Sequence, residues 1–260
     1  QPREFSAMRS GLIDMAVGSP INWSPQVPEA NLFSLPFLMP DDAAVDAITQ
    51  GEAGKMVFEA IEKRGVVPLA WGENGFREIS NSSKPISQPE DLKGLKIRVV
   101  GSPLFLDTFN ALGANPTQMS WTDALPALTT GAVDGQENPL AVYDVARADR
   151  ANQKYLTLWH YMNDPLIFGV SQRVWNTLSP EDQTLLKEAA IDAGKWEIEK
   201  SRTELKDTLE RINERGVEIT ELSPEQHQAF VDATQSVYEK WTPRIGPELV
   251  EAAQQAIANR

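Results

Sequence analysis

The chain has 260 residues, 41% of them hydrophobic and 23% charged, with a formal net charge of −13. This length predicts one or two globular domains with a buried core. No apolar run approaches the ~18 residues of a membrane helix, so we expect no direct membrane insertion. The acidic charge repels nucleic acid and anionic lipid and disfavours both as partners.

The residue inventory excludes several kinds of site. Cysteine is absent, and histidine occurs only at His160 and His227. Disulfides, zinc–thiolate sites, iron–sulfur clusters and thiol catalysis are therefore excluded. The sequence also lacks G-x-S-x-G, P-loop, G-x-G-x-x-G and H-E-x-x-H motifs. We expect no metal, no cofactor and no catalytic residues.

Residues 1–136 predict short helices alternating with short strands. Helices are predicted to end at Gly11, to carry Val45 and Ile48, to carry Met56 and Ile61, and to cover residues 103–112 and 121–130. Strands are predicted over residues 13–17, 65–70, 95–100 and 132–136. Residues 71–75 contain two glycines and are predicted to form a turn after the second strand.

The second half predicts two strands, over residues 154–159 and 165–171, and then a more highly charged, helical sequence. From Ser179, an N-cap followed by proline, a charged helical pattern of about 35 residues runs to Gly216, some 50 Å at 1.5 Å per residue. It lacks a strict heptad, so we expect a strut across two lobes rather than a coiled coil. A strand over 217–220 and helices starting near Ser223 and Pro243 complete an α/β chain with mainly parallel sheets.

Residues 5–14 and 125–134 share one pattern at an offset of 120 residues. In both, a helix ends at glycine, a strand passes through aspartate, and a polar loop follows. The pattern is either a generic helix–glycine–strand turn or the sign of two similar lobes facing a shared cleft. Ligands of open α/β sheets bind near such loops at the strand ends.

Charged residues near two strands are candidate ligand contacts. Arg98 ends a strand of apolar neighbours, so its planar guanidinium can bind a carboxylate bidentately in a partly dry cleft. Arg77 can add a second cation, and Glu73 can accept hydrogen bonds from hydroxyl or amine groups. The alternative is an ordinary turn in which Arg77 is solvated.

Aromatic and amide side chains can complete such a cleft. Trp71 and Trp121 offer apolar area and an N–H donor, or simply pack. Asn138 precedes proline, which predicts a helix N-cap, but its amide can also face a ligand. His160 lies between two aromatic residues at a strand end, where a core role is the more common one.

Four segments in family-like order resemble the DctP-type solute-binding proteins of TRAP transporters. They are residues 75–81 (GFREISN), 89–99 (PEDLKGLKIRV), 112–117 (LGANPT) and 130–139 (TGAVDGQENP). The similarity extends from residues 10–14 into the long charged helix.

This resemblance implies a bilobal periplasmic-binding-protein fold with mixed sheets, hinge strands and a long helix spanning both lobes. It implies lobe I at residues 1–74 plus 164–203 and lobe II at 75–163 plus 204–260, with the ligand cleft between them. It also implies a periplasmic, monomeric receptor, exported by a signal peptide, that delivers a small organic acid to TRAP membrane permease subunits.

By the same resemblance, Arg98 clamps the ligand carboxylate. Arg77, Asn138 and Trp121 line the cleft, and Gly18, Ser19 and Asn22 contribute from the other lobe. Relatives begin with a strand, helix and strand upstream of Gln1, so we expect a missing N-terminal segment. Gly101 stands where many relatives carry a proline-containing turn, which predicts extra space.

The predicted ligand is a sugar acid such as a uronate or aldonate. Glu73 beside two arginines suits one carboxylate and several hydroxyls, and Trp71, Phe76 and Trp121 can cover a sugar ring. A four-carbon dicarboxylate comes second and an aromatic or keto acid third, and an ectoine-like zwitterion is a further alternative. An acidic-sugar lyase or isomerase using Glu73 or His160 as base, and a sensor module docking on a receptor kinase, are the competing functions.

Overall fold

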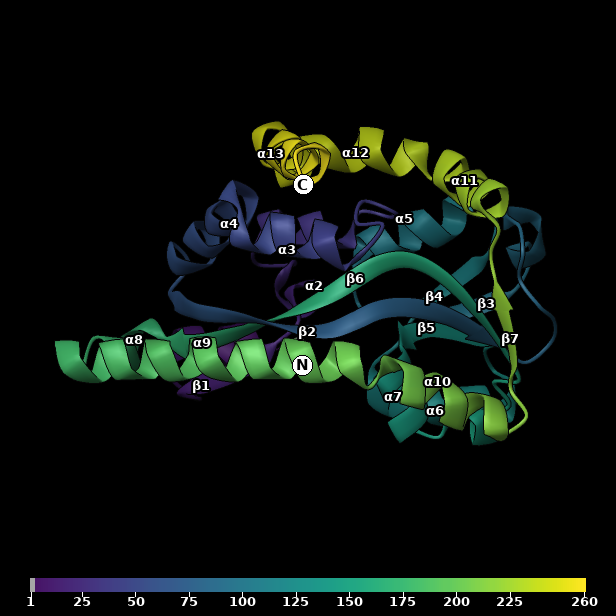
Figure 1. Ribbon diagram of the computed structural model, residues 1–260, viewed down its shortest axis with the longest axis horizontal. Helices are drawn as coiled ribbons and strands as arrows, with labels where there is room; N and C mark the ends of the chain where they lie inside the picture. Colours follow the sequence, from purple (N-terminus) through teal and green to yellow (C-terminus); the bar gives the residue numbers. More distant parts are fainter. Residues whose placement is uncertain (1–2) are drawn as a thin grey trace.

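The computed structural model describes residues 3–260, in which seven strands form one sheet in the order β1-β6-β2-β5-β3-β4, with β7 paired to β6 (Figure 1). The strands are β1 Met15–Gly18, β2 Val66–Asn81, β3 Lys96–Val99, β4 Asn115–Gln118, β5 Gly135–Pro139, β6 Tyr155–Ser171 and β7 Glu218–Glu221. The two long strands β2 and β6 run side by side across the whole molecule. Residues of β2 and β6 therefore contribute to both of the hydrophobic cores described below.

Helices cover both sides of the sheet. The first half contains α1 Glu4–Ser10, α2 Pro20–Trp23, η1 Pro28–Ser34, α3 Asp42–Gln50, α4 Glu52–Glu62, η2 Pro89–Leu92, α5 Pro103–Ala111 and α6 Trp121–Thr130. The second half contains α7 Leu140–Val145, η3 Ala148–Ala151, α8 Gln172–Trp175, α9 Pro180–Thr203, α10 Leu205–Glu214, α11 Pro224–Ala233, α12 Gln235–Ile245 and α13 Pro247–Ala258.

The repeated helix–glycine–strand pattern is present at both places. Gly11 and Gly131 cap α1 and α6 in the left-handed conformation, with φ of 78° and 72°. The strands that follow, β1 and β5, both end at the ligand-sized cavity described below. The two matching sequence segments therefore present equivalent loops.

The predicted turn at residues 71–75 is wrong, because this segment lies inside β2. Its two glycines are needed for close packing and for a β-bulge within this strand. A Cβ on Gly72 would lie 2.9 Å from Oε2 of Glu197 on α9, and Gly75 has φ 98° at a register shift between β2 and β6. The two strands predicted over 154–159 and 165–171 are likewise one strand, β6.

Long antiparallel pairing also overturns the expectation of mainly parallel sheets. β6 pairs antiparallel with β1 and β2, and β2 pairs antiparallel with β5. Only β3–β4, β3–β5 and β6–β7 are parallel. The predicted helix of about 35 residues is divided at Glu204 into α9 and α10, and Pro243 lies in the last turn of α12 rather than at a helix start.

Two hydrophobic cores flank the sheet. One joins α1, η1, α3 and α4 with Val66 of β2 and Ile167 of β6, and the other joins β3 and α5 with Ile79 of β2 and Trp159 of β6. Helices α12 and α13 bury Trp241 and Leu249 in the first core, with α3 and α4 (Figure 1). The apolar faces of α12 and α13 thus complete the core of the N-terminal helices.

Candidate ligand-binding site

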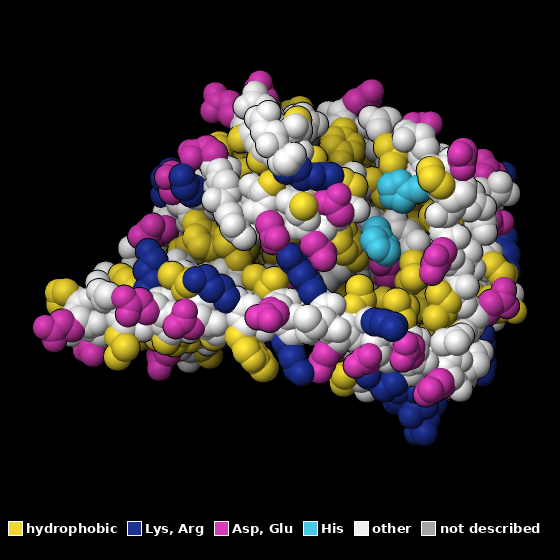
Figure 2. Space-filling model, viewed as in Figure 1, with side chains coloured by type: hydrophobic (Ala, Val, Ile, Leu, Met, Phe, Trp, Pro, Cys, Tyr) yellow, Lys and Arg dark blue, Asp and Glu magenta, His cyan; other side chains and the backbone are white. Residues whose placement is uncertain are grey.

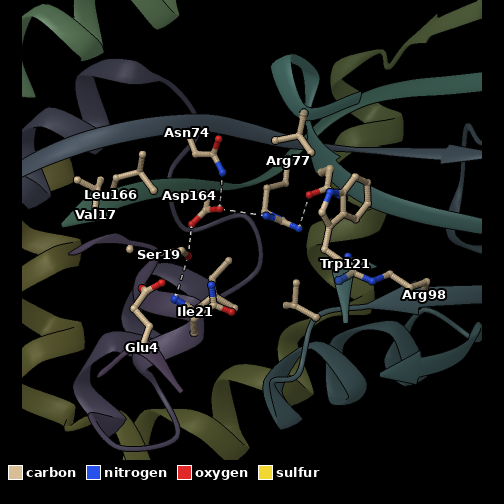
Figure 3. A pocket seen from close by; sticks show the side chains of 15 residues that line it. Glu4, Val17, Ser19, Ile21, Asn74, Arg77, Arg98, Trp121, Asp164 and Leu166 are labelled. Carbon is tan, nitrogen blue, oxygen red and sulfur yellow. Dashed lines mark hydrogen bonds and ion pairs between the residues drawn. The ribbon is translucent and has the colours of Figure 1, made fainter. Parts of the chain in front are cut away.

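A cavity of about 240 Å³ lies where the loop after β1 approaches the ends of β3 and β5 (Figure 3). Polar and apolar side chains both line it. Predicted site residues that it brings together are Gly18, Ser19, Asn22, Arg77, Arg98, Trp121 and Asn138. Further lining residues are Glu4, Val17, Ile21, Asn74, Val100, Val142, Asp164 and Leu166.

Arg98 lies in β3 and is 2% exposed. Its Nε and Nη2 both donate to the carbonyl oxygen of Met119, at 3.0 and 2.8 Å, and its guanidinium carbon lies 5.4 Å from the centre of the Trp121 ring. Nη1 is buried and has no hydrogen-bond partner within residues 3–260. Burial lowers the pKa of Arg98 to about 10, although Glu137 opposes this shift. The side chain therefore has one guanidinium nitrogen without a partner among these residues, with two N–H donors, and a stacked, fixed orientation.

Arg77 of β2 is buried and, unlike Arg98, has a hydrogen-bond partner for every nitrogen of its guanidinium. Its Nε and Nη2 donate to the Glu137 carboxylate at 2.5 and 2.9 Å, and its Nη1 donates to Asp164 at 3.0 Å. Burial alone would lower the pKa of Arg77, but the two carboxylates outweigh burial and raise it. Nη2 also donates to Oδ1 of Asn138 at 3.2 Å. Arg77 thus fixes the floor of the cavity.

Asp164 of β6 connects three segments around the cavity. One carboxylate oxygen accepts from the Ser19 hydroxyl at 2.5 Å, and the other accepts from Asn74 at 3.1 Å as well as from Arg77 (Figure 3). Ser19 also caps α2 by accepting from the Ile21 amide. The loop after β1 is therefore tied to the long strands through one buried carboxylate.

The N-cap interpretation of Asn138 is wrong, because Asn138 belongs to β5 and Pro139 holds the cap position without a side-chain bond. The Asn138 amide nitrogen donates to Gln136, and its oxygen accepts from Arg77. Its side chain thus lines the cavity next to Arg77. Trp121 begins α6, as predicted, and its indole forms the wall beside Arg98 (Figure 3).

Glu73 and Trp71 lie outside this cavity. Glu73 is 3% exposed and paired with Arg202 of α9, whose Nε and Nη2 donate to it at 3.0 and 2.6 Å. Trp71 stacks on Phe58 at 4.4 Å in the first hydrophobic core. The sequence analysis placed both in a turn at the cleft. Inside a strand they face α9 and the core instead.

His160 lines a second cavity of about 150 Å³ with Glu73, Phe76 and Arg202. Its Nδ1 lies 2.9 Å from Oε1 of Glu78, and its ring stacks on Phe76. Burial would lower the pKa of His160, but the hydrogen bond to Glu78 raises it. Neither base candidate of the enzyme hypothesis therefore faces the larger cavity. Figure 2 shows both histidines on one face of the molecule.

Two acidic residues that pair with Arg77 received no role from the sequence, and one of them, Asp164, lines the cavity. Asp164 precedes Pro165 in a segment that was predicted to separate two strands. Glu137 was part of a quoted motif but received no role. Asp164 pairs with Gly75, two residues before Arg77, so the register of the continuous strands puts the Arg77 and Asp164 side chains on one face.

The described part of the chain adds two further observations. Within residues 3–260, no helix is long and apolar enough to cross a bilayer. No group of three or more His, Cys, Asp or Glu side chains there is placed to hold a metal ion.

Comparison with known proteins shows close relatives along the whole chain. A TRAP periplasmic solute-binding protein from Ralstonia eutropha H16, solved with bound (S)-2-acetolactate, is 58% identical and superposes with a TM-score of 0.97, over 100% of this chain and 84% of that chain. The 2,3-diketo-L-gulonate-binding periplasmic protein YiaO of Escherichia coli is 35% identical, over 88% of this chain and 69% of its own. The C4-dicarboxylate-binding periplasmic protein DctP of Rhodobacter capsulatus is 31% identical, over 98% of this chain and 77% of its own.

The family assignment follows from these similarities and from the match of one family pattern. Bacterial extracellular solute-binding protein family 7, DctP, matches residues 1–244. The bilobal α/β architecture is the one seen in the solved TRAP receptors. The chain therefore belongs to the DctP family, whose members are substrate-binding receptors of TRAP transporters and not enzymes.

Proposed function

We propose that this receptor works in the periplasm, as a monomer, and delivers a short monocarboxylate to its TRAP permease: a 2-hydroxy or 2-oxo acid with aliphatic substituents. The observation that carries the proposal is the unpaired Nη1 of Arg98, buried at a cavity that also presents five aliphatic side chains. A carboxylate there gains a charge-assisted hydrogen bond at a nitrogen that otherwise has none.

The charges around the cavity favour a single carboxylate. Arg77 is already shared by Glu137 and Asp164, so it offers no unpaired charge to a second ligand carboxylate. Glu4 adds another negative charge to the lining. A four-carbon dicarboxylate would therefore meet repulsion without a second free cation.

The aliphatic part of the lining gives methyl groups of a ligand a place to pack. Val17, Ile21, Val100, Val142 and Leu166 offer no hydrogen bonds, so a hydroxyl placed against them would be unpaired. The features behind the predicted sugar acid, Glu73 and Trp71, lie elsewhere. The relative at 58% identity binds 2-hydroxy-2-methyl-3-oxobutanoate, an acid of the proposed type.

We place the hinge between the lobes where β2 and β6 lose register, between Glu73 and Gly75 and opposite Asp164. Helix α9 is hydrogen-bonded to β2 just before this register shift, since the Glu197 carboxylate accepts from the Glu73 backbone amide at 2.7 Å. Residues 235–258 belong with lobe I in this proposal, because α12 and α13 share its core.

Thermal unfolding and calorimetry with separate ligands test the proposal. The ligands are (S)-2-hydroxy-2-methyl-3-oxobutanoate, galactonate, galacturonate and succinate. A micromolar ligand at millimolar concentration adds about 4 kcal/mol to the stability of the folded state. We expect the first acid to raise the melting temperature most. A larger shift with galactonate or galacturonate would restore the sugar-acid prediction, and one with succinate would favour the dicarboxylate.

A further inference from the structure

The two ends of the ligand-sized cavity carry opposite charge. Arg98 and Trp121 lie at one end, and Glu4 lies at the other, beside Ser19 and Val17 (Figure 3). Glu4 is the first residue of α1 and had no role in the sequence analysis. A ligand held by Arg98 therefore extends its other end toward a carboxylate.

The position of Glu4 is fixed by two buried neighbours. Its Oε1 accepts a hydrogen bond from Nε1 of Trp23 at 3.0 Å, and Trp23 is fully buried. Its carboxylate also lies against the backbone of Gly18, where an added Cβ would come within 2.1 Å of Oε1. Gly18 thus makes room for Glu4. The carboxylate is oriented by the protein and not by solvent.

The charge of Glu4 is not neutralised by a neighbouring cation. Glu137 and Asp164 both pair with Arg77, whereas no Lys or Arg within residues 3–260 forms an ion pair with Glu4. An unpaired charge beside a partly buried cavity acts more strongly on a ligand than one in open water, because screening is weaker there.

We propose that Glu4 is a charge filter: it excludes acids that carry a second carboxylate at the end remote from Arg98, and so restricts the receptor to monocarboxylates. This inference rests on the proposed function and names the residue that sets its ligand class. A ketone or methyl group at that end meets no repulsion. A carboxylate there faces a like charge that the protein cannot move without breaking the bond to Trp23.

Two acids of one carbon frame test the filter. They are (S)-2-hydroxy-2-methyl-3-oxobutanoate and 2-hydroxy-2-methylbutanedioate, which bears a carboxylate at the remote end. Calorimetry gives the Kd of each acid for the wild-type receptor and for Glu4→Gln. The glutamine keeps an oxygen for Trp23 and removes the charge. We expect Glu4→Gln to bind the diacid about tenfold more tightly and the monoacid within about threefold of wild type.

Two variants and the salt dependence show whether Glu4 discriminates between the acids by its charge or by its shape. Glu4→Asp keeps the charge and should keep the discrimination, and Glu52→Gln, an exposed carboxylate on α4, should change neither Kd. The wild-type preference should shrink as salt rises, which a purely steric role would not produce. An unchanged ratio of the two Kd values in Glu4→Gln would overturn the filter while the monocarboxylate proposal stands.

The remaining outcomes are also decisive. Equal wild-type affinity for both acids would overturn the filter. Loss of galactonate binding in Glu4→Gln would overturn it too, because Glu4 would then accept a ligand hydroxyl. Binding of neither test acid would overturn the proposed function, and the filter with it.

Discussion

Strand β2 separates two cavities that contain the same kinds of residue but differ in how their arginines are used. Arg77 faces the larger cavity, next to Arg98, while Phe76 and Glu78 face the smaller one, next to Arg202. Arg202 donates to Glu73 through Nε and Nη2 and to Asp46 through Nη1 and Nη2. Arg98 keeps Nη1 unused.

The difference shows that hydrogen-bond capacity separates a ligand-binding arginine from a structural one. Both arginines have carboxylates nearby. Arg202 satisfies two carboxylates and joins α3, α9 and β2, so it has no capacity left for a ligand. Arg98 has only a backbone carbonyl as partner, so its charge is available to an incoming anion.

Arg98→Ala should give the largest effect on ligand binding. Losing a charge-assisted, partly buried pair costs on the order of 3 kcal/mol, which is more than a hundredfold in Kd. Calorimetry with the best ligand of the panel measures it. The ligand-free variant should lose some stability, since the Met119 carbonyl and the Trp121 ring lose their partner, but no carboxylate is left unpaired. An increase in Kd of less than tenfold would contradict the clamp.

Arg98→Lys is the matched control for this prediction. It keeps a positive charge but loses the planar guanidinium that stacks on Trp121. We expect an affinity between those of Arg98→Ala and wild type.

Arg202→Met should show the opposite pattern, with loss of stability and unchanged binding. Glu73, only 3% exposed, would lose its cation, at a cost of about 3 kcal/mol. Thermal unfolding should shift down by about 6–10 °C, while Kd stays within about twofold. The double variant Glu73→Gln/Arg202→Met should recover much of the loss. A large change in Kd would instead support the original prediction that Glu73 contacts the ligand.

The pH dependence of binding should give the smallest effect. A bound carboxylate raises the pKa of Arg98 above its ligand-free value of about 10. Its contribution to affinity is therefore complete below pH 10 and is lost as the pH rises through that value, by about fourfold at pH 10.5. Calorimetry from pH 6 to 10.5 measures it. A loss of affinity at a pH above 6.5 but well below 10 would point to His160 instead, whose pKa is raised by its hydrogen bond to Glu78.

Local patterns were sufficient to predict that Arg98 lies at the end of a buried strand. Its apolar neighbours in a short strand place the guanidinium at a buried strand end, and the structure has it there. The caps at Gly11 and Gly131 were equally readable, because a helix that ends in the left-handed conformation favours glycine. The resemblance to DctP proteins added the arrangement of the two lobes.

Long-range partners were not predictable in this way. The cation that pairs with Glu73 is Arg202, 129 residues later, and no local signal in residues 71–77 announces it. Gly72 and Gly75 resemble turn residues, yet one makes room for α9 and the other permits a bulge. Asp164 was missed for the same reason, since its partners Ser19, Asn74 and Arg77 come from distant segments.

The length of β2 and β6 has a consequence for how the molecule unfolds. Val66 and Ile79 of β2, and Ile167 and Trp159 of β6, belong to different cores, so each strand is built into both. Neither core can melt without fraying a ladder that the other needs, because β2 and β6 run from one core to the other as continuous strands. We therefore expect the whole chain to unfold in one cooperative transition.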